Sequence, residues 1–132
     1  MKKCVLDSSF LIDLLNEIAE AEPGPAFRWV QRNAAAQLWI TPVTMAEVLE
    51  GASEPAVVEA YLARYSWQGI HRVHAQKVAQ RQRRAAHRMG ENDAWQAAIA
   101  EHLGAVLVGN EDAAFQRVGA HYEDHRREST QR

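Results

Sequence analysis

Five acidic side chains stand out because each lies where a short apolar segment has just ended or where a helix is expected to begin. They are Asp7, Glu47, Asp93, Glu111 and Asp112. If the fold gathers them in one crevice they repel one another, since two unit charges ~4 Å apart cost on the order of 4 kcal/mol at a dielectric constant of about 20. Such a group needs a cation, and all-oxygen ligands select Mg²⁺ or Mn²⁺. The chemistry that suits this arrangement is metal-dependent hydrolysis of a phosphodiester bond.

Each carboxylate also has an ordinary structural explanation. Thr44 and Glu47 have the spacing of a capping box, in which Glu47 would only bond back to the backbone of Thr44. Asp93 and Asp112 could be simple helix N-caps, and Asp7 could begin an Asx turn. Acids occur at four separate junctions, and chance alone would rarely produce that arrangement. This favours the catalytic interpretation.

The segments between these acids alternate between short apolar runs, typical of buried strands, and longer stretches of helical periodicity. Strands are expected at 3–6, 38–40 and 105–108, and helices at 10–18, 27–36, 44–50, 55–65, 75–89 and 93–103. Residues 67–73 suggest a loop with a short strand around Ile70 and Val73, and residues 113–118 a short closing helix or turn. This alternation predicts an α/β fold with a mostly parallel central sheet, whose ligand site lies beyond the carboxyl ends of the strands.

Length and composition limit the other possibilities. The chain has 132 residues, 47% of them hydrophobic, a formal charge of −2 and a single cysteine. One folded domain is expected at this length, and Cys4 alone excludes a disulfide framework or a multi-cysteine zinc site. The sequence shows neither an apolar run long enough to span a bilayer nor a signal peptide, so no membrane association and a cytoplasmic location are expected.

Four stretches of the sequence resemble the PIN-domain family, and more narrowly the VapC toxin ribonucleases of toxin–antitoxin pairs. The stretches are VLDSSFLI at 5–12, PVTMAEVLEG at 42–51, NDAWQAAIA at 92–100 and LVGNEDAAF at 107–115. The resemblance implies a three-layer α/β/α domain over residues 1–122. Residues 123–132 are polar and are expected to form a frayed tail. The resemblance also implies metal-binding roles for Asp7, Glu47 and Asp93, with Glu111 as the fourth acid and Asp112 close behind it.

The same resemblance implies an endoribonuclease that uses Mg²⁺ or Mn²⁺, forms a homodimer and is inhibited by a VapB-like antitoxin. Ser9 and Thr44 would support the site, although Ser9 could instead be a helix N-cap. The fourth stretch departs from the family pattern, because Gly109 stands where Thr or Ser is usual and Glu111 where Asp or Asn is usual. Two alternatives remain: a PIN nuclease of RNA processing without an antitoxin, and a catalytically silent PIN-like domain that binds a partner.

A basic segment lies between Ala60 and Gly90, with seven Lys or Arg residues and no Asp or Glu. Four of these residues are spaced as one stripe on the expected helix, namely Lys77, Arg81, Arg84 and Arg88. The stripe is either an ordinary solvated helix face or a surface that contacts the RNA backbone or an antitoxin, and the absence of acids favours the second interpretation. No histidine lies at a strand-to-helix junction, which argues against a metal-free ribonuclease.

Overall fold

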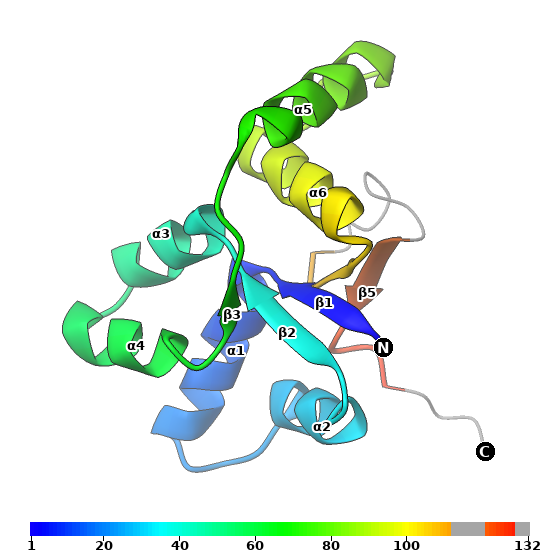
Figure 1. Ribbon diagram of the computed structural model, residues 1–132. Coiled ribbons are helices and arrows are strands. Elements are labelled where there is room, and N and C mark those ends of the chain that lie inside the picture. The colour runs from blue at the N-terminus through cyan, green and yellow to red at the C-terminus, as the bar shows by residue number, and fades with distance from the viewer. Residues whose placement is uncertain (112–120, 129–132) are drawn as a thin grey trace.

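The computed structural model describes residues 1–111 and 121–128, which form five strands and six helices (Figure 1). The strands are β1 (Lys3–Leu6), β2 (Gln37–Ile40), β3 (Ser66–Trp67), β4 (Val106–Gly109) and β5 (Tyr122–Asp124). The helices are α1 (Ser8–Ala19), α2 (Pro25–Arg32), α3 (Pro42–Glu50), α4 (Pro55–Leu62), α5 (Arg72–Arg84) and α6 (Glu91–Leu103). All strand pairs are parallel and their order is β3-β2-β1-β4-β5. The predicted α/β fold with a parallel central sheet is confirmed.

Helices cover both faces of the sheet, with α5 and α6 on one side and α1 to α4 on the other (Figure 1). Because successive side chains of a strand point to opposite faces, β1 contributes to two cores. Cys4 and Leu6 pack with Phe10, Trp29 and other residues of the α1 to α4 side. Val5 packs with the alanine-rich face of α6 and with Leu107 of β4. This arrangement is the expected three-layer α/β/α architecture.

The order of the strands creates a switch point at the middle of the sheet. From β1 the chain steps outward to β2 and β3, then returns to place β4 on the opposite side of β1. The connections after β1 and β4 therefore leave the sheet in different directions, and parallel α/β sheets form their ligand crevices at such points. The backbone amide of Asp7 donates to the carbonyl of Val108 over 2.8 Å, which ties the ends of β1 and β4 together at this point.

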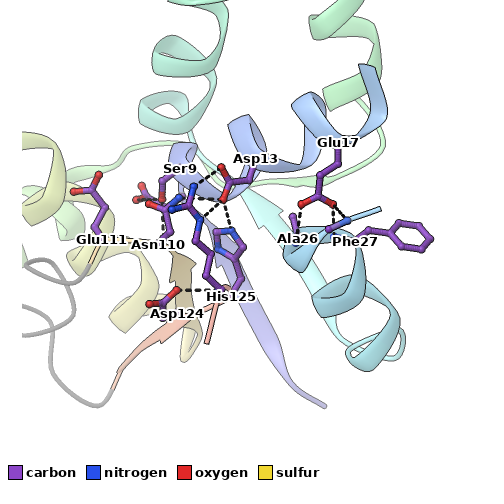
Figure 2. A network of polar contacts seen from close by, with 12 residues as sticks. Ser9, Asp13, Glu17, Ala26, Phe27, Asn110, Glu111, Asp124 and His125 are labelled. Carbon is purple, nitrogen blue, oxygen red and sulfur yellow. Dashed lines mark hydrogen bonds and ion pairs between the residues drawn. The ribbon is translucent and has the colours of Figure 1, made fainter. Parts of the chain in front are cut away.

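Two helices begin with caps that explain where they start. Thr41 is the N-cap of α3: its hydroxyl accepts from the backbone amide of Thr44 at 3.2 Å, and Pro42 suits the first helical turn. Helix α2 is capped from a distance by Glu17 of α1. The Glu17 carboxylate accepts the backbone amides of Gly24, Ala26 and Phe27 at 2.8–3.0 Å (Figure 2). A carboxylate is favourable there because the first amides of a helix have no partner within the helix.

The expected strand around Ile70 and Val73 is wrong in position. The edge strand β3 is formed by the exposed pair Ser66–Trp67, and Val73 belongs to the first turn of α5. Periodicity is uninformative for a strand of two exposed residues, because neither side chain needs to be apolar.

The expected helix at 75–89 is displaced, since α5 begins at Arg72 and ends at Arg84. The following segment folds back instead of continuing the helix, because the side chain of Gln82 bonds both the amide and the carbonyl of Met89 at 2.9 and 3.0 Å. Met89 is thereby buried in the same core as Val78. In the sequence Met89 therefore continues the apolar spacing of a helix, although its backbone is not helical.

The expectation of a frayed tail from residue 123 is also wrong for the part of the tail that the structure describes. Strand β5 pairs with β4, and the side chains of Tyr122 and His125 are buried. The polar residues of this segment are satisfied by partners distant in the sequence, chiefly Asp13. Residues 112–120 and 129–132, which include Asp112 and the expected closing helix, lie outside the described residues. No described helix has the length and apolar character needed to cross a bilayer.

Candidate active site

Asp7 lies at the carboxyl end of β1 and is the most buried of the candidate acids, with 7% of its surface exposed. Its carboxylate accepts Gln96 Nε2 at 3.3 Å and Ser9 Oγ at 3.4 Å. The pKa of Asp7 is raised to about 6, chiefly by burial and in addition by the charges of Glu47 and Asp93, against hydrogen bonds that lower it. The three acids expected at separate junctions are therefore electrostatic neighbours.

Gln96 connects the elements around Asp7 and was not predicted as a site residue. It is 1% exposed; its Oε1 accepts Thr41 Oγ1 at 2.6 Å and its Nε2 donates to Thr44 Oγ1 at 2.6 Å. Thr44 in turn donates to the carbonyl of Leu6 at 2.8 Å. This chain of bonds ties α3 and α6 to the end of β1. The available signal was its spacing of three residues from Asp93, which puts both side chains on one helix face.

Glu47 connects the beginnings of two helices. Its Oε1 accepts Ser8 Oγ at 2.7 Å and its Oε2 accepts Asn92 Nδ2 at 2.6 Å. The capping-box alternative is therefore wrong: Thr41 caps α3, and the Glu47 carboxylate turns toward α1 and α6. Its half-buried position beside Asp7 makes it the second acid of the crevice.

Asp93 lies in the first turn of α6, whose N-cap is Gly90, so the interpretation of Asp93 as an N-cap is wrong. A carboxylate in the first turn is stabilised by the positive end of the helix dipole. Its oxygen lies 3.7 Å from the place where a Cβ on Gly90 would be. Asp93 thus lies at the N-terminus of α6, where the helix dipole offsets part of its repulsion with Asp7.

The acid expected to be the fourth, Glu111, belongs to the loop after β4. Glu111 is exposed, and its backbone amide donates to the hydroxyl of Tyr122 at 2.9 Å. Burial raises the pKa of Tyr122, and the charges of Asp7 and Glu111 both contribute to the rise, so this phenol lies near both carboxylates. Ser9 links the same loop to Asp7, because its hydroxyl accepts the amide of Asn110 at 3.0 Å. Ser9 is accordingly not the N-cap of α1, a position that Asp7 occupies.

A second polar cluster, centred on Asp13, contacts Asn110 at the start of this loop, as Figure 2 shows. The carboxylate of Asp13 accepts Asn110 Nδ2 at 3.1 Å, pairs with His125 Nε2 at 2.8 Å, and receives a two-pronged contact from Arg126 at 2.8 and 2.9 Å. Partial burial raises the pKa of Asp13, but the hydrogen bonds from Arg126, His125 and Asn110 outweigh burial and hold it below its usual value. His125 also packs edge-on against Phe10, with ring centroids 4.8 Å apart. No local pattern could have predicted this cluster, because its members are about a hundred residues apart.

The family model of the PIN domain matches residues 4–121. The chain belongs to the PIN-domain family. A search of curated proteins finds no significant match.

Several solved structures share the fold of this PIN domain. DNA-bound VapBC from Salmonella typhimurium is 24% identical with a TM-score of 0.76, and the match covers 95% of this chain and 99% of the other. VapBC-1 from nontypeable Haemophilus influenzae is 19% identical with a TM-score of 0.72 and the same coverage. VapBC-5 from Mycobacterium tuberculosis, a member of a family of toxin–antitoxin systems, is 20% identical with a TM-score of 0.64, covering 94% and 98%. At these identities the likeness establishes the fold.

The acids of this PIN domain fit a hard divalent cation in their chemistry. Among residues 1–111 and 121–128, no three His, Cys, Asp or Glu side chains converge as a ready-made metal cage. Mg²⁺, however, is usually held by one or two carboxylates and keeps several waters. Asp7 and Asp93 supply that minimum, and Asp7 is a buried carboxylate beside like charges, which a cation would stabilise.

Three of the four residues of the basic stripe form ion pairs with acids of α6 in the folded structure. Lys77 and Arg81 both pair with Glu101 of α6, at 3.2 and 3.0 Å, and Arg88 lies beyond the end of α5 and pairs with Glu91 at 2.9 Å. The acids that the segment lacks are thus supplied by the neighbouring helix. Arg84 ends α5 on an exposed surface. Whether these four residues contact RNA or an antitoxin stays a prediction.

Proposed function

We propose that this PIN domain is a Mg²⁺- or Mn²⁺-dependent endoribonuclease and the toxin of a VapBC-like toxin–antitoxin pair. PIN domains are generally nucleases. The observation that supports activity in this chain is the buried Asp7 at the switch point of the sheet, to which Glu47 and Asp93 lie near enough for their charges to raise its pKa. A domain that only binds a partner has no need of repelling carboxylates around a buried acid, because their repulsion costs stability.

In this proposal Asp7 and Asp93 hold the cation, with Glu47, Glu111 and Asp112 as further ligands. The bound cation would polarise the phosphoryl group and supply the attacking hydroxide. The protein's own contribution is orientation. Gln96 and Ser9 fix the Asp7 carboxylate, while Ser8 and Asn92 hold both oxygens of Glu47, so these two acids keep their places without the cation. Such preorganisation lowers the cost of binding a phosphate-bound metal.

The proposed partners are a single-stranded or structured RNA substrate, a VapB-like antitoxin and a second copy of the chain, all in the cytoplasm. The antitoxin is supported by the solved VapBC structures that share this fold. It is also supported by an apolar groove between α1 and the α3–α4 pair, which includes Leu15, Val48 and the 43% exposed Ile12. An amphipathic segment of a partner could bury this groove.

The deciding experiment measures cleavage of RNA with Mg²⁺ or Mn²⁺ in wild type, Asp7→Asn, Asp93→Asn and Glu47→Gln. Glu50→Gln is the matched control, because Glu50 ends the same helix as Glu47 and is exposed. We expect the site variants to lose on the order of a hundredfold in kcat, in line with loss of an electrostatic catalytic group, and Glu50→Gln to match wild type. Undiminished cleavage in Asp7→Asn and Asp93→Asn, or in excess chelator, would refute the metal-dependent mechanism.

A second experiment separates a toxin from a nuclease of RNA processing or a silent binding domain. Expression of the chain should arrest growth, and co-expression of a small protein encoded beside it should relieve the arrest. Growth arrest that persists in Asp7→Asn would indicate that partner binding, and not cleavage, is the activity.

A further inference from the structure

Gly109 is the last residue of β4. Glycine is needed there because a side chain would not fit, and not because of the backbone conformation. Among the described glycines only Gly104 has a positive φ, so any residue type could adopt the backbone of Gly109. A Cβ at this position, however, would lie 2.6 Å from Ser9 Oγ and 3.1 Å from Asp7 Cβ, and closer still to the hydroxyl of Tyr122. The missing side chain therefore opens a slot at the carboxyl end of β4, directly beside the acid crevice.

The slot is filled by the phenol of Tyr122, which comes from the neighbouring strand. Tyr122 of β5 is in register with Leu107 of β4, is 3% exposed, and packs in the core beneath α5 and α6. Its ring belongs to that apolar core, while its hydroxyl accepts the Glu111 amide at 2.9 Å and hydrogen-bonds with Ser9. A phenylalanine would satisfy the core equally well, so packing alone does not explain the hydroxyl.

The hydroxyl completes a continuous chain of hydrogen bonds across the site. The chain runs from the Glu111 amide to Tyr122, from Tyr122 to Ser9, and from Ser9 Oγ to Asp7 Oδ2 at 3.4 Å. A tyrosine phenol, with an ordinary pKa of about 10, is protonated at neutral pH. It can therefore accept one hydrogen bond and donate another.

We propose that Tyr122 is a positioning residue of the carboxylate site: its hydroxyl enters through the slot at Gly109 and fixes the Glu111 backbone and Ser9 around Asp7. Strand β5, which runs into the segment expected to be a polar tail, thereby holds Glu111 at the described start of the loop after β4. The effect on RNA cleavage rests on the proposed function, whereas the effect on the loop does not.

The first test replaces Tyr122 by Phe and follows hydrogen exchange of single backbone amides by NMR. The control is Tyr65→Phe, which removes another half-buried hydroxyl, bonded to that of Tyr61 at 2.9 Å. Loss of one hydrogen bond corresponds to about a tenfold change. We expect the Glu111 amide of Tyr122→Phe to exchange about tenfold faster, with no change at the Asp7 amide, which donates to Val108 instead. Unchanged protection of the Glu111 amide would overturn the proposal.

The second test uses the slot itself. Gly109→Ala should lower the melting temperature because the new Cβ meets the Tyr122 and Ser9 oxygens. Adding Tyr122→Phe removes the nearer of these oxygens, so the double variant should melt above Gly109→Ala. If the two losses simply add, the hydroxyl does not occupy the slot and the proposal fails.

The third test measures cleavage of RNA with Mn²⁺. We expect Tyr122→Phe to lower kcat about tenfold while KM for RNA stays unchanged, because the loop positions the acids and does not hold the substrate's distant parts. A purely structural role would instead leave kcat unchanged below the melting transition, as expected for Tyr65→Phe, and that result would refute the positioning role. If Asp7→Asn also leaves cleavage unchanged, the proposed function fails, while the exchange and melting results still decide whether Tyr122 orders the loop.

Discussion

Replacing Asp7 by Asn should make the metal-free protein more stable at neutral pH while lowering kcat for cleavage on the order of a hundredfold. Asp7 has a pKa of about 6 in the folded protein against an ordinary value of 3.8, because the fold buries it beside Glu47 and Asp93. The folded state therefore binds this proton more tightly than the unfolded state. The contribution of Asp7 to the free energy of unfolding is highest below about pH 4 and falls as the pH rises through about 6.

The size of the effect follows from the shift. A rise of about 2 pKa units corresponds to about 3 kcal/mol at 1.36 kcal/mol per unit, and the group is buried enough that solvent screens little of it. Asn cannot ionise, keeps an oxygen that can accept from Gln96, and is close to Asp in size. We expect Asp7→Asn to exceed wild type by up to about 3 kcal/mol at about pH 7.5, with no difference below about pH 4.

The assay is urea unfolding of both proteins in chelator across this pH range, with the difference in free energy of unfolding plotted against pH. Titrating groups that do not interact with Asp7 cancel in this difference. Addition of Mn²⁺ at about a hundred times its Kd should then restore about 3 kcal/mol to wild type and nothing to Asp7→Asn. Equal stabilities at neutral pH, or a difference that does not change between about pH 4 and 7.5, would refute the electrostatic reasoning.

Three further variants test the surroundings of the site. Asp13→Asn should behave oppositely to Asp7→Asn: it should lose about 2 kcal/mol at neutral pH, with the deficit closing as the pH falls, because the pKa of Asp13 is lowered in the folded state. Urea unfolding at several pH values checks this sign. Glu17→Ala should cost about 2 kcal/mol by uncapping α2, and calorimetry should show a lower melting temperature with unchanged kcat. Glu101→Gln should release Lys77 and Arg81; if these residues contact RNA, fluorescence anisotropy should show tighter binding and a steeper dependence on salt.

The predictable part of the fold came from strands and helices whose signals are local. The aliphatic runs of β1 and β4 must be buried on both faces, and Gly104 can end α6 because it adopts the left-handed conformation at φ 66°. The predictions that were wrong concern segments whose structure depends on contacts with distant parts of the chain. Met89 is buried through the side chain of Gln82, and β5 is ordered through pairing with β4 and contacts with Asp13, all of which depend on partners outside the local pattern.

The same division applies to the site. The sequence by itself determined which acids lie at the ends of the strands, because parallel strands of an α/β sheet present their carboxyl ends together. Asp7 and Glu47 followed from that rule, whereas Asp93, which begins a helix that follows another helix, followed from the expected helix start and the family resemblance. What surrounds them was decided by the tertiary structure: the buried Gln96, the slot at Gly109 with the Tyr122 hydroxyl inside it, and the pairing of the basic stripe with Glu101. Hydrogen-bond partners and charge neighbours depend on distances of a few ångströms between segments far apart in the chain, and periodicity along a sequence contains no information about those distances.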